Sequence, residues 1–256
     1  MQAVPLRILP CEAGEGDHAK HGGGGGSPSR LMNLLAIDTA ANLCAACVWD
    51  IAAGVERGRS VADLGKGHAE HLMATIDEAL SASGLSYAGI GALAVSVGPG
   101  SFTGVRVGVA TARGLALALK IPATGVSTLE ALAAETRFMH PGRPVLVAIE
   151  AGRGDFYAAV YDEFGSVRYA PAVVSFDEAL ALAQETRPAL AGTAAGKLST
   201  IPGDLPLGPL AATADIATYA RIAAQRGPGA EKPRPLYLRA PDAKPQAGFV
   251  LPRTGR

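Results

Sequence analysis

The sequence has few cysteines and no excess of charge of either sign. Its 256 residues include three cysteines, Cys11, Cys44 and Cys47, which are too few and odd in number for a disulfide scaffold. Lys plus Arg and Asp plus Glu number 23 each, so the formal net charge is zero. Proteins that hold nucleic acid alone usually carry a basic excess, so this balance argues against unaided nucleic-acid binding. A net charge near zero also favours association, so we expect a partner or a second copy.

The sequence also lacks an uninterrupted apolar run of membrane-spanning length. The best candidate, Val105–Leu119, is broken by Arg106 and Arg113. The N-terminus lacks the continuous apolar stretch of a signal peptide. These features predict a cytoplasmic protein that does not contact a membrane.

Residues 1–31 differ from the rest of the chain. They contain an unbroken Gly22–Gly26 run and little apolar surface, which predicts a flexible tail. Met32 stands just before the apolar run Leu34–Ile37. Two interpretations remain open: Met32 is the natural start, or the tail is a genuine disordered extension.

From Met32 onward, one order of elements occurs twice: three strands, a helix, a strand and a helix. In the first copy, strands are predicted at 34–37, 43–49, 55–61, 90–97 and 122–126, with helices at about 70–81 and 103–119. In the second, strands are predicted at 145–149, 155–161, 167–174 and 189–191, with helices starting at Ser175 and spanning 214–225. Between the copies, Ser127 and Glu130 predict a capping box at the start of a further helix.

This duplication is the most informative feature of the chain. Leu34–Asp38 even resembles Leu146–Glu150, the first strand of the second copy. Meandering strands followed by helix crossovers predict an α/β fold of two similar lobes, residues 32–126 and 127–256. Each lobe would be a mixed sheet flanked by helices.

Asp38 and Thr39 end the first predicted strand, where ligands lie in α/β sheets. They could hold a metal and a phosphate, or Asp38 could bond the backbone amides of its own turn. Ala40 and Ala41 stand where a phosphate loop would carry glycine. Glu150 has the equivalent place in the second lobe, so the two carboxylates could face a shared cleft.

A glycine-rich loop, Gly98–Gly104, lies between a predicted strand and a long helix. A helix N-terminus is a natural anion site, but the Lys-Ser/Thr pair of a P-loop is missing. The loop is either an anion site or a tight turn in which Gly98, Gly100 and Gly104 are structural.

The remaining candidates have simpler explanations. Cys44 and Cys47 lie three apart in a predicted strand, so they point to opposite faces and act as small apolar residues rather than a redox pair. His68 and His71 open a helix and could share a metal, but no third ligand is evident, so a helix start or a partner contact is favoured. No arrangement of a nucleophile with histidine and a carboxylate stands out.

The long helix carries Arg106, Arg113 and Lys120 at intervals of seven, which predicts a basic stripe on a solvated face. Its other faces are apolar, with small residues between. They would serve internal packing or a partner interface.

Several strings of this sequence resemble the TsaB (YeaZ) family. The most specific is Val97–Arg106, which reads VGPGSFTGVR. Supporting matches lie at 35–39, 68–72, 76–80, 125–132, 149–157 and 237–239. The resemblance covers roughly residues 32–239. It departs from the family at Ser96-Val97, where Gly-Arg is frequent.

The resemblance implies a duplicated RNase H-like fold, also described as actin-like or sugar-kinase-like, in the Gcp/Kae-like group of the actin-like ATPase superfamily. It implies a scaffold that activates a TsaD-like catalytic subunit and is not an enzyme by itself. With a TsaE-like ATPase, such a complex transfers a threonylcarbamoyl group to adenosine 37 of tRNAs that read ANN codons. The tRNA would be bound only through the complex. No catalytic residue, cofactor or metal is expected in this chain.

By the same resemblance, helices of the first lobe pair with the partner. The side chains expected there are His68, His71, Leu72, Ile76, Val105, Val109 and Ala112. Two alternatives stay open. One is an enzyme, either an ATP-dependent protein of actin-like fold or a glycoprotease-like protein; the other is a free-standing homodimeric interaction module.

Overall fold

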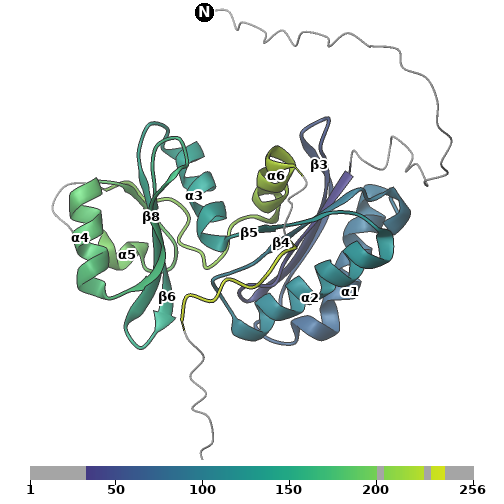
Figure 1. Ribbon diagram of the computed structural model, residues 1–256, viewed down its shortest axis with the longest axis horizontal. Helices are drawn as coiled ribbons and strands as arrows, with labels where there is room; N and C mark the ends of the chain where they lie inside the picture. Colours follow the sequence, from purple (N-terminus) through teal and green to yellow (C-terminus); the bar gives the residue numbers. More distant parts are fainter. Residues whose placement is uncertain (1–32, 201–204, 228–231, 240–256) are drawn as a thin grey trace, which may run out of the picture.

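The structure is a computed structural model that describes residues 33–200, 205–227 and 232–239. The predicted tail, with Cys11 and Met32, lies outside the described residues. Figure 1 shows two sheets side by side, with helices outside them and between them. The predicted α/β fold of two similar lobes is therefore confirmed.

The first sheet has five strands in the order β3-β2-β1-β4-β5. They are β1 (Asn33–Asp38), β2 (Leu43–Asp50), β3 (Val55–Asp63), β4 (Ala92–Ser96) and β5 (Ala123–Val126). β1, β2 and β3 pair antiparallel, whereas β4 and β5 run parallel to β1, so the sheet is mixed. β2 is apolar on both faces because helices cover both sides of it.

The second sheet repeats this topology with one strand fewer, in the order β8-β7-β6-β9. Its strands are β6 (Val145–Gly152), β7 (Asp155–Tyr161), β8 (Val167–Val174) and β9 (Ala189–Ala191). β6 pairs antiparallel with β7 and parallel with β9, just as β1 pairs with β2 and β4. The duplication in the sequence is thus a duplication of topology.

Helices cover the outer face of each sheet (Figure 1). They are α1 (His68–Ser83) and α2 (Phe102–Leu119) on the first sheet, and α4 (Phe176–Thr186) and α5 (Ala195–Leu198) on the second. α1 and α2 each turn an apolar stripe toward the strands, with Ile76 and Val109 among its buried members. The side chains of these stripes form the core of the outer half of the first lobe.

Two further helices, α3 (Thr128–Met139) and α6 (Ile216–Arg226), fill the space between the sheets. α3 follows the first sheet in the chain but packs on β6 and β9, whereas α6 comes last and packs on β1 and β2. With the inner faces of both sheets they form one continuous hydrophobic cluster, which includes the fully buried Leu132 and Tyr219. The two lobes therefore share a core.

Residues 232–239, which we call the strap, also join the lobes. The N–H of Leu236 donates to the carbonyl of Val97 in the first lobe (2.8 Å). Arg239 pairs with Asp155 and donates to the carbonyl of Ala151 in the second lobe. Figure 1 shows this yellow segment running from beside β4 to the lower end of β6.

The predicted capping box at the start of α3 is wrong. The Ser127 Oγ does cap the helix, but it accepts from the N–H of Leu129 (3.2 Å). The Glu130 carboxylate pairs instead with Arg226 of α6. A partner far away in the sequence has displaced the local one, which no local pattern could reveal.

Candidate functional site

The first candidate site is the turn that follows β1. Asp38 is buried, and its Oδ1 accepts a hydrogen bond from the N–H of Ala40 (2.9 Å). The carboxyl thus bonds its own turn, which is one of the two interpretations that the sequence left open. Burial raises the pKa of Asp38, although Ser96, the N–H of Ala40 and Thr213 all act to lower it. A carboxyl enclosed in this way is not open to a ligand.

The glycine-rich loop lies directly on this turn. The N–H of Ser101 donates to the carbonyl of Ala40 (2.6 Å), and the Thr39 Oγ1 donates to the carbonyl of Gly104 (2.8 Å). A Cβ on Gly100 would lie 2.1 Å from the Ala40 oxygen, and one on Gly104 would lie 2.0 Å from the Thr39 oxygen. Glycine is required at both positions because the two backbones touch. These contacts bring the loop and the turn together with no space between their backbones at these positions.

The start of the loop is tied to α3. Gly98 has a φ of 86°, in the left-handed region that favours glycine. Its carbonyl accepts a hydrogen bond from the N–H of Thr128 (2.9 Å). All three glycines singled out in the sequence therefore make contacts that hold the loop between β1, α2 and α3.

A cleft of about 300 Å³ opens between the lobes beside this turn. It is lined by Ala40, Ala41, Gly100, Ser101, Ile149, Glu150, Ala151, Tyr157 and Ala212. Glu150 reaches this cleft, whereas Asp38 and Thr39 are buried and do not line it. The Glu150 Oε1 lies 2.7 Å from the Nζ of Lys197, which neutralises its charge. The structure therefore does not bring the two carboxylates together.

The side chains that the family resemblance assigns to a partner surface are mostly buried in this chain. The buried ones are His68, Leu72, Ile76, Val105, Val109 and Ala112, whereas His71 is exposed. An apolar helical stripe looks the same whether it faces a sheet or a partner, and here it faces the sheet. A partner can reach only the outer faces of α1 and α2.

Those outer faces carry apolar and small side chains. Met73 of α1 is 44% exposed and Leu117 of α2 is 79% exposed. Ala110 and Gly114 are also exposed, and a Cβ on Gly114 would meet nothing within 4 Å. This surface has open space in front of it.

The three histidines that the structure describes do not converge. The His68 Nε2 lies 3.2 Å from the carbonyl oxygen of Leu43, while His71 is exposed. The His140 Nε2 lies 3.0 Å from the carbonyl oxygen of Leu207. Among the residues that the structure describes, no group of three or more His, Cys, Asp or Glu could hold a metal ion.

Cys44 and Cys47 lie on opposite faces of β2, as predicted. Cys44 belongs to the cluster under α1 and α2, and Cys47 belongs to the central cluster between the sheets. Both thiols are free, and burial raises the pKa of each. They are core residues.

Aromatic and cationic side chains meet at the start of α2, a grouping that the sequence did not reveal. The guanidinium carbon of Arg106 lies 3.5 Å from the centroid of the Phe102 ring. The Arg106 Nε donates to the Tyr237 hydroxyl (2.7 Å) on the strap. Both rings are about half exposed. Arg106 and Tyr237 are far apart in the chain, so no periodic pattern links them.

Within the described ranges, α2 is long and apolar enough to cross a membrane by length and composition alone. Its 18 residues exceed the 15-residue run that the sequence suggested. Core helices of soluble proteins meet the same criterion, and α2 packs its apolar stripe on β4 and β1.

Comparisons with known proteins agree with this fold. Residues 62–229 match the family model described as TsaD, tRNA N6-adenosine threonylcarbamoyltransferase. The tRNA threonylcarbamoyladenosine biosynthesis protein TsaB of Escherichia coli K12 is 39% identical over 139 residues, which cover 52% of this chain and 58% of that protein. The corresponding TsaB of Haemophilus influenzae is 36% identical, over 49% of this chain and 52% of that protein. The chain thus spans little more than half the length of these two curated relatives.

Other matches extend over both lobes. An uncharacterized protein of Mycobacterium bovis is 32% identical over 233 residues, which cover 85% of this chain and 97% of that protein. The solved structure of YeaZ from Pseudomonas aeruginosa has a TM-score of 0.61 and 26% identity, over 80% of this chain and 99% of that chain. A second Pseudomonas aeruginosa structure, described as similar to peptidase YeaZ, has a TM-score of 0.66 and 28% identity, over 81% and 99%. The family model covers more than half of the chain, so the chain belongs to the family that this model describes, and the relatives named TsaB and YeaZ support its assignment to the TsaB (YeaZ) group of that family.

Proposed function

We propose that this chain is the non-catalytic scaffold of a complex that transfers a threonylcarbamoyl group to adenosine 37 of tRNAs that read ANN codons. It pairs with a TsaD-like catalytic subunit and activates it. A TsaE-like ATPase completes the assembly, which binds the tRNA and acts in the cytoplasm. The names of the curated TsaB relatives, as threonylcarbamoyladenosine biosynthesis proteins, support this proposal.

The closed turn at Asp38 is the observation that carries the non-catalytic part of the proposal. An enzyme that uses a nucleotide needs an open loop whose amides can reach phosphates. Here Thr39 and Ala40 are in direct backbone contact with Gly104 and Gly100. The charged lining residue of the adjacent cleft is Glu150, which pairs with Lys197, so this lining offers a phosphate no net positive charge. Chemistry in the partner subunit fits this arrangement.

The partner surface in this proposal is the outer face of α1 and α2. Met73 supplies exposed apolar contact there. The small side chain of Ala110 would let a partner helix approach closely, because the distance between packed helices depends on the side chains at the contact.

Size-exclusion chromatography with light scattering tests the pairing directly. We expect a 1:1 or 2:2 peak when the chain is mixed with the TsaD-like protein of the same organism. Ala110→Glu and Met73→Glu should each remove that peak, because an unpaired carboxylate desolvated in an interface costs several kcal/mol. Ala181→Glu, at an exposed alanine of α4, is the matched control and should leave the peak intact.

The outcomes of this experiment separate the alternatives. A mixed peak that survives both glutamate variants would rule out this face as the interface. If the unaltered chain forms no mixed peak and only a self-dimer persists, the scaffold proposal fails and the homodimeric module is favoured.

The enzyme alternatives predict turnover by the pure chain. We expect neither ATP hydrolysis nor proteolysis from it. ATP hydrolysis that disappears in a folded Asp38→Asn variant would revive the ATP-dependent enzyme.

A further inference from the structure

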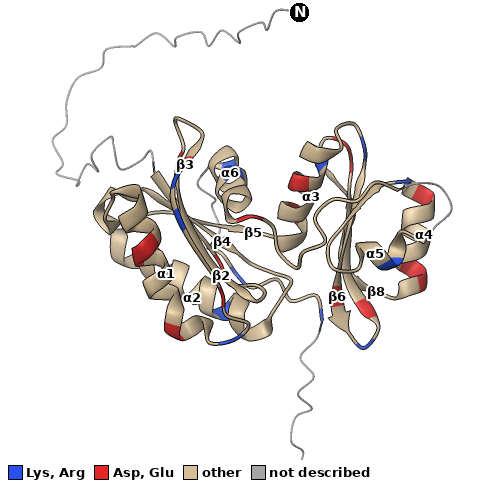
Figure 2. Cartoon of the chain, turned by 180° about the vertical axis from the view of Figure 1, so that it is seen from behind, with Lys and Arg blue, Asp and Glu red and all other residues tan. Residues whose placement is uncertain are grey.

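One face of the first lobe carries charge of a single sign, although the chain as a whole is neutral. Residues 79–129 contain no Asp or Glu, and their cations are Arg106, Arg113 and Lys120. This stretch includes α2, the loop before it and β5. Figure 2 shows acidic positions on α1 and none on α2, the two outer helices of the first lobe. Overall neutrality therefore hides a local cationic surface.

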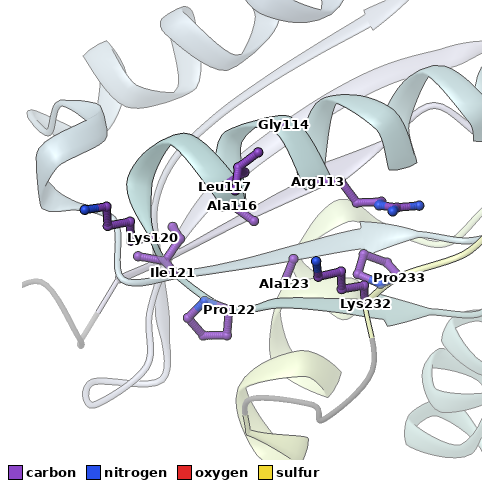
Figure 3. Close-up of a pocket in the computed structure, with 10 residues that line it drawn as sticks. All are labelled: Arg113, Gly114, Ala116, Leu117, Lys120, Ile121, Pro122, Ala123, Lys232 and Pro233. Carbon is purple, nitrogen blue, oxygen red and sulfur yellow. The ribbon is translucent and has the colours of Figure 1, made fainter.

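Three cations surround a pocket at the C-terminal end of α2 (Figure 3). The pocket has a volume of about 560 Å³, and its charged lining residues are Arg113, Lys120 and Lys232 of the strap. The rest of the lining is uncharged: Gly114, Ala116, Leu117, Ile121, Pro122, Ala123 and Pro233. No carboxylate belongs to this lining. A cationic rim over an apolar floor suits an anion that also has an apolar or planar part.

Structural roles account for only part of this arrangement. Lys120 ends α2, where a cation complements the helix dipole. Arg113 can cover apolar surface with its stem. Neither role explains why Lys232, from a distant segment, joins them around the same pocket.

The aromatic cluster continues this surface toward the other end of α2. The Phe102 and Tyr237 rings lie 6.0 Å apart, and the Arg106 guanidinium contacts both. Exposed aromatic rings and guanidinium planes are the groups on which unpaired bases stack. From Phe102 to Lys120 the helix is about 27 Å long, which is enough for several nucleotides.

We propose that this cationic face binds RNA through unpaired nucleotides. It comprises Arg106, Arg113, Lys120, Lys232, Phe102 and Tyr237. The lysines and Arg113 would contact backbone phosphates, and the two rings would stack on bases. An acidic peptide would use the charges but not the paired rings, so RNA is the better match. Only one part of this inference rests on the proposed function, namely that the RNA is a tRNA.

Fluorescence anisotropy with a short single-stranded RNA tests the charges. Each phosphate contact in a single strand contributes about 0.7 to the slope of log affinity against log salt. Three contacts then predict about 20-fold weaker binding for a fourfold rise in salt. Replacing Arg113, Lys120 and Lys232 together by Gln should make the slope shallower by about 2. The matched control replaces Lys66, Arg143 and Arg168 by Gln and should leave the slope unchanged.

The rings are tested separately. Phe102→Ala and Tyr237→Ala should each weaken RNA binding about 5-fold or more while leaving the salt slope unchanged. Phe164→Ala, at a phenylalanine that is 83% exposed in the second lobe, is the control and should have no effect. Circular dichroism confirms that each variant is folded.

Mixing each variant with the TsaD-like protein keeps this proposal distinct from the proposed function. The Gln variants should retain the mixed peak while losing RNA affinity. If the Gln variants and their controls bind RNA equally well, the cationic face is not the RNA-binding surface. The scaffold proposal would be unaffected by that result. An acidic peptide that binds the pocket where RNA does not would overturn the RNA assignment as well. If the unaltered chain binds RNA with the expected slope but forms no mixed peak, the cationic face stands without the scaffold.

Discussion

Gly104 and Gly114 belong to the same helix, yet their surroundings are opposite. A Cβ at 104 would lie 2.0 Å from the backbone oxygen of Thr39, whereas one at 114 would meet nothing within 4 Å. Gly104→Ala should lower the free energy of unfolding by about 2–3 kcal/mol or more, because backbone cannot move aside. Gly114→Ala should raise it by about 0.5–1 kcal/mol, because glycine weakens a helix interior. Urea unfolding of both variants measures the difference, and equal effects would contradict the packing of loop on turn.

Asp38 makes the stability of the fold depend on pH. Its pKa is raised by burial in the folded chain, so folding opposes ionisation. Its contribution to stability is greatest below the ordinary pKa of an aspartate and is lost as pH rises through the raised pKa. Asp38→Asn cannot ionise, so it should gain stability relative to the parent as pH rises.

Urea unfolding of parent and Asp38→Asn variant at a series of pH values tests this directly. The free energy of unfolding of the variant minus that of the parent should climb with pH and then level off. A difference that stays flat or falls with pH would show that folding does not raise the pKa of Asp38.

Residue patterns predicted geometry within one element better than contacts between elements. The period of two in a strand was enough to place Cys44 and Cys47 on opposite faces. The family resemblance assigned the stripe containing Ile76 and Val109 to a partner, and the apolar pattern could not correct this because it does not say what lies opposite. The contact between Arg106 and Tyr237 depends on where the strap runs, which periodicity does not encode.

At the scale of elements, α4 has the complete cap that α3 lacks. The Ser175 side chain accepts from the N–H of Glu178, and the Glu178 carboxylate accepts from the N–H of Ser175. Ser175→Ala should cost about 1 kcal/mol of unfolding free energy. Ser81→Ala, at an exposed position of α1, should be neutral or slightly stabilising because alanine favours helices. Thermal melting of both variants checks this, and equal melting temperatures would remove the role assigned to the cap.

The order of strands and helices was predictable because each has its own apolar period and its own turns. The positions of α3 and α6 were not predictable in this way. Both are amphipathic, and either could have covered the sheet that precedes it in the chain. Instead α3 packs on the second sheet and α6 returns to the first. Which sheet each of these helices covers depends on the order of the strands and on where the chain crosses between the two sheets.

At the scale of the whole molecule, the shared central core should make unfolding a single event. Ile76 lies in the core of the first lobe and Leu190 in that of the second. Ile76→Ala and Leu190→Ala should each cost about 2–5 kcal/mol and shift the same transition. Calorimetry should give one peak whose measured and van't Hoff enthalpies agree. Two peaks, each sensitive to only one of these variants, would show that the lobes unfold independently.

The return of α6 to the first sheet also affects how the protein is made. α6 is synthesised about 90 residues after β5. The five strands of the first sheet are therefore made before the helix that packs on their inner face. At the usual pace of synthesis that delay is roughly 5–20 s. Throughout it, an apolar surface that includes Cys47 faces water on the nascent chain. The central core can therefore close only when this last helix arrives.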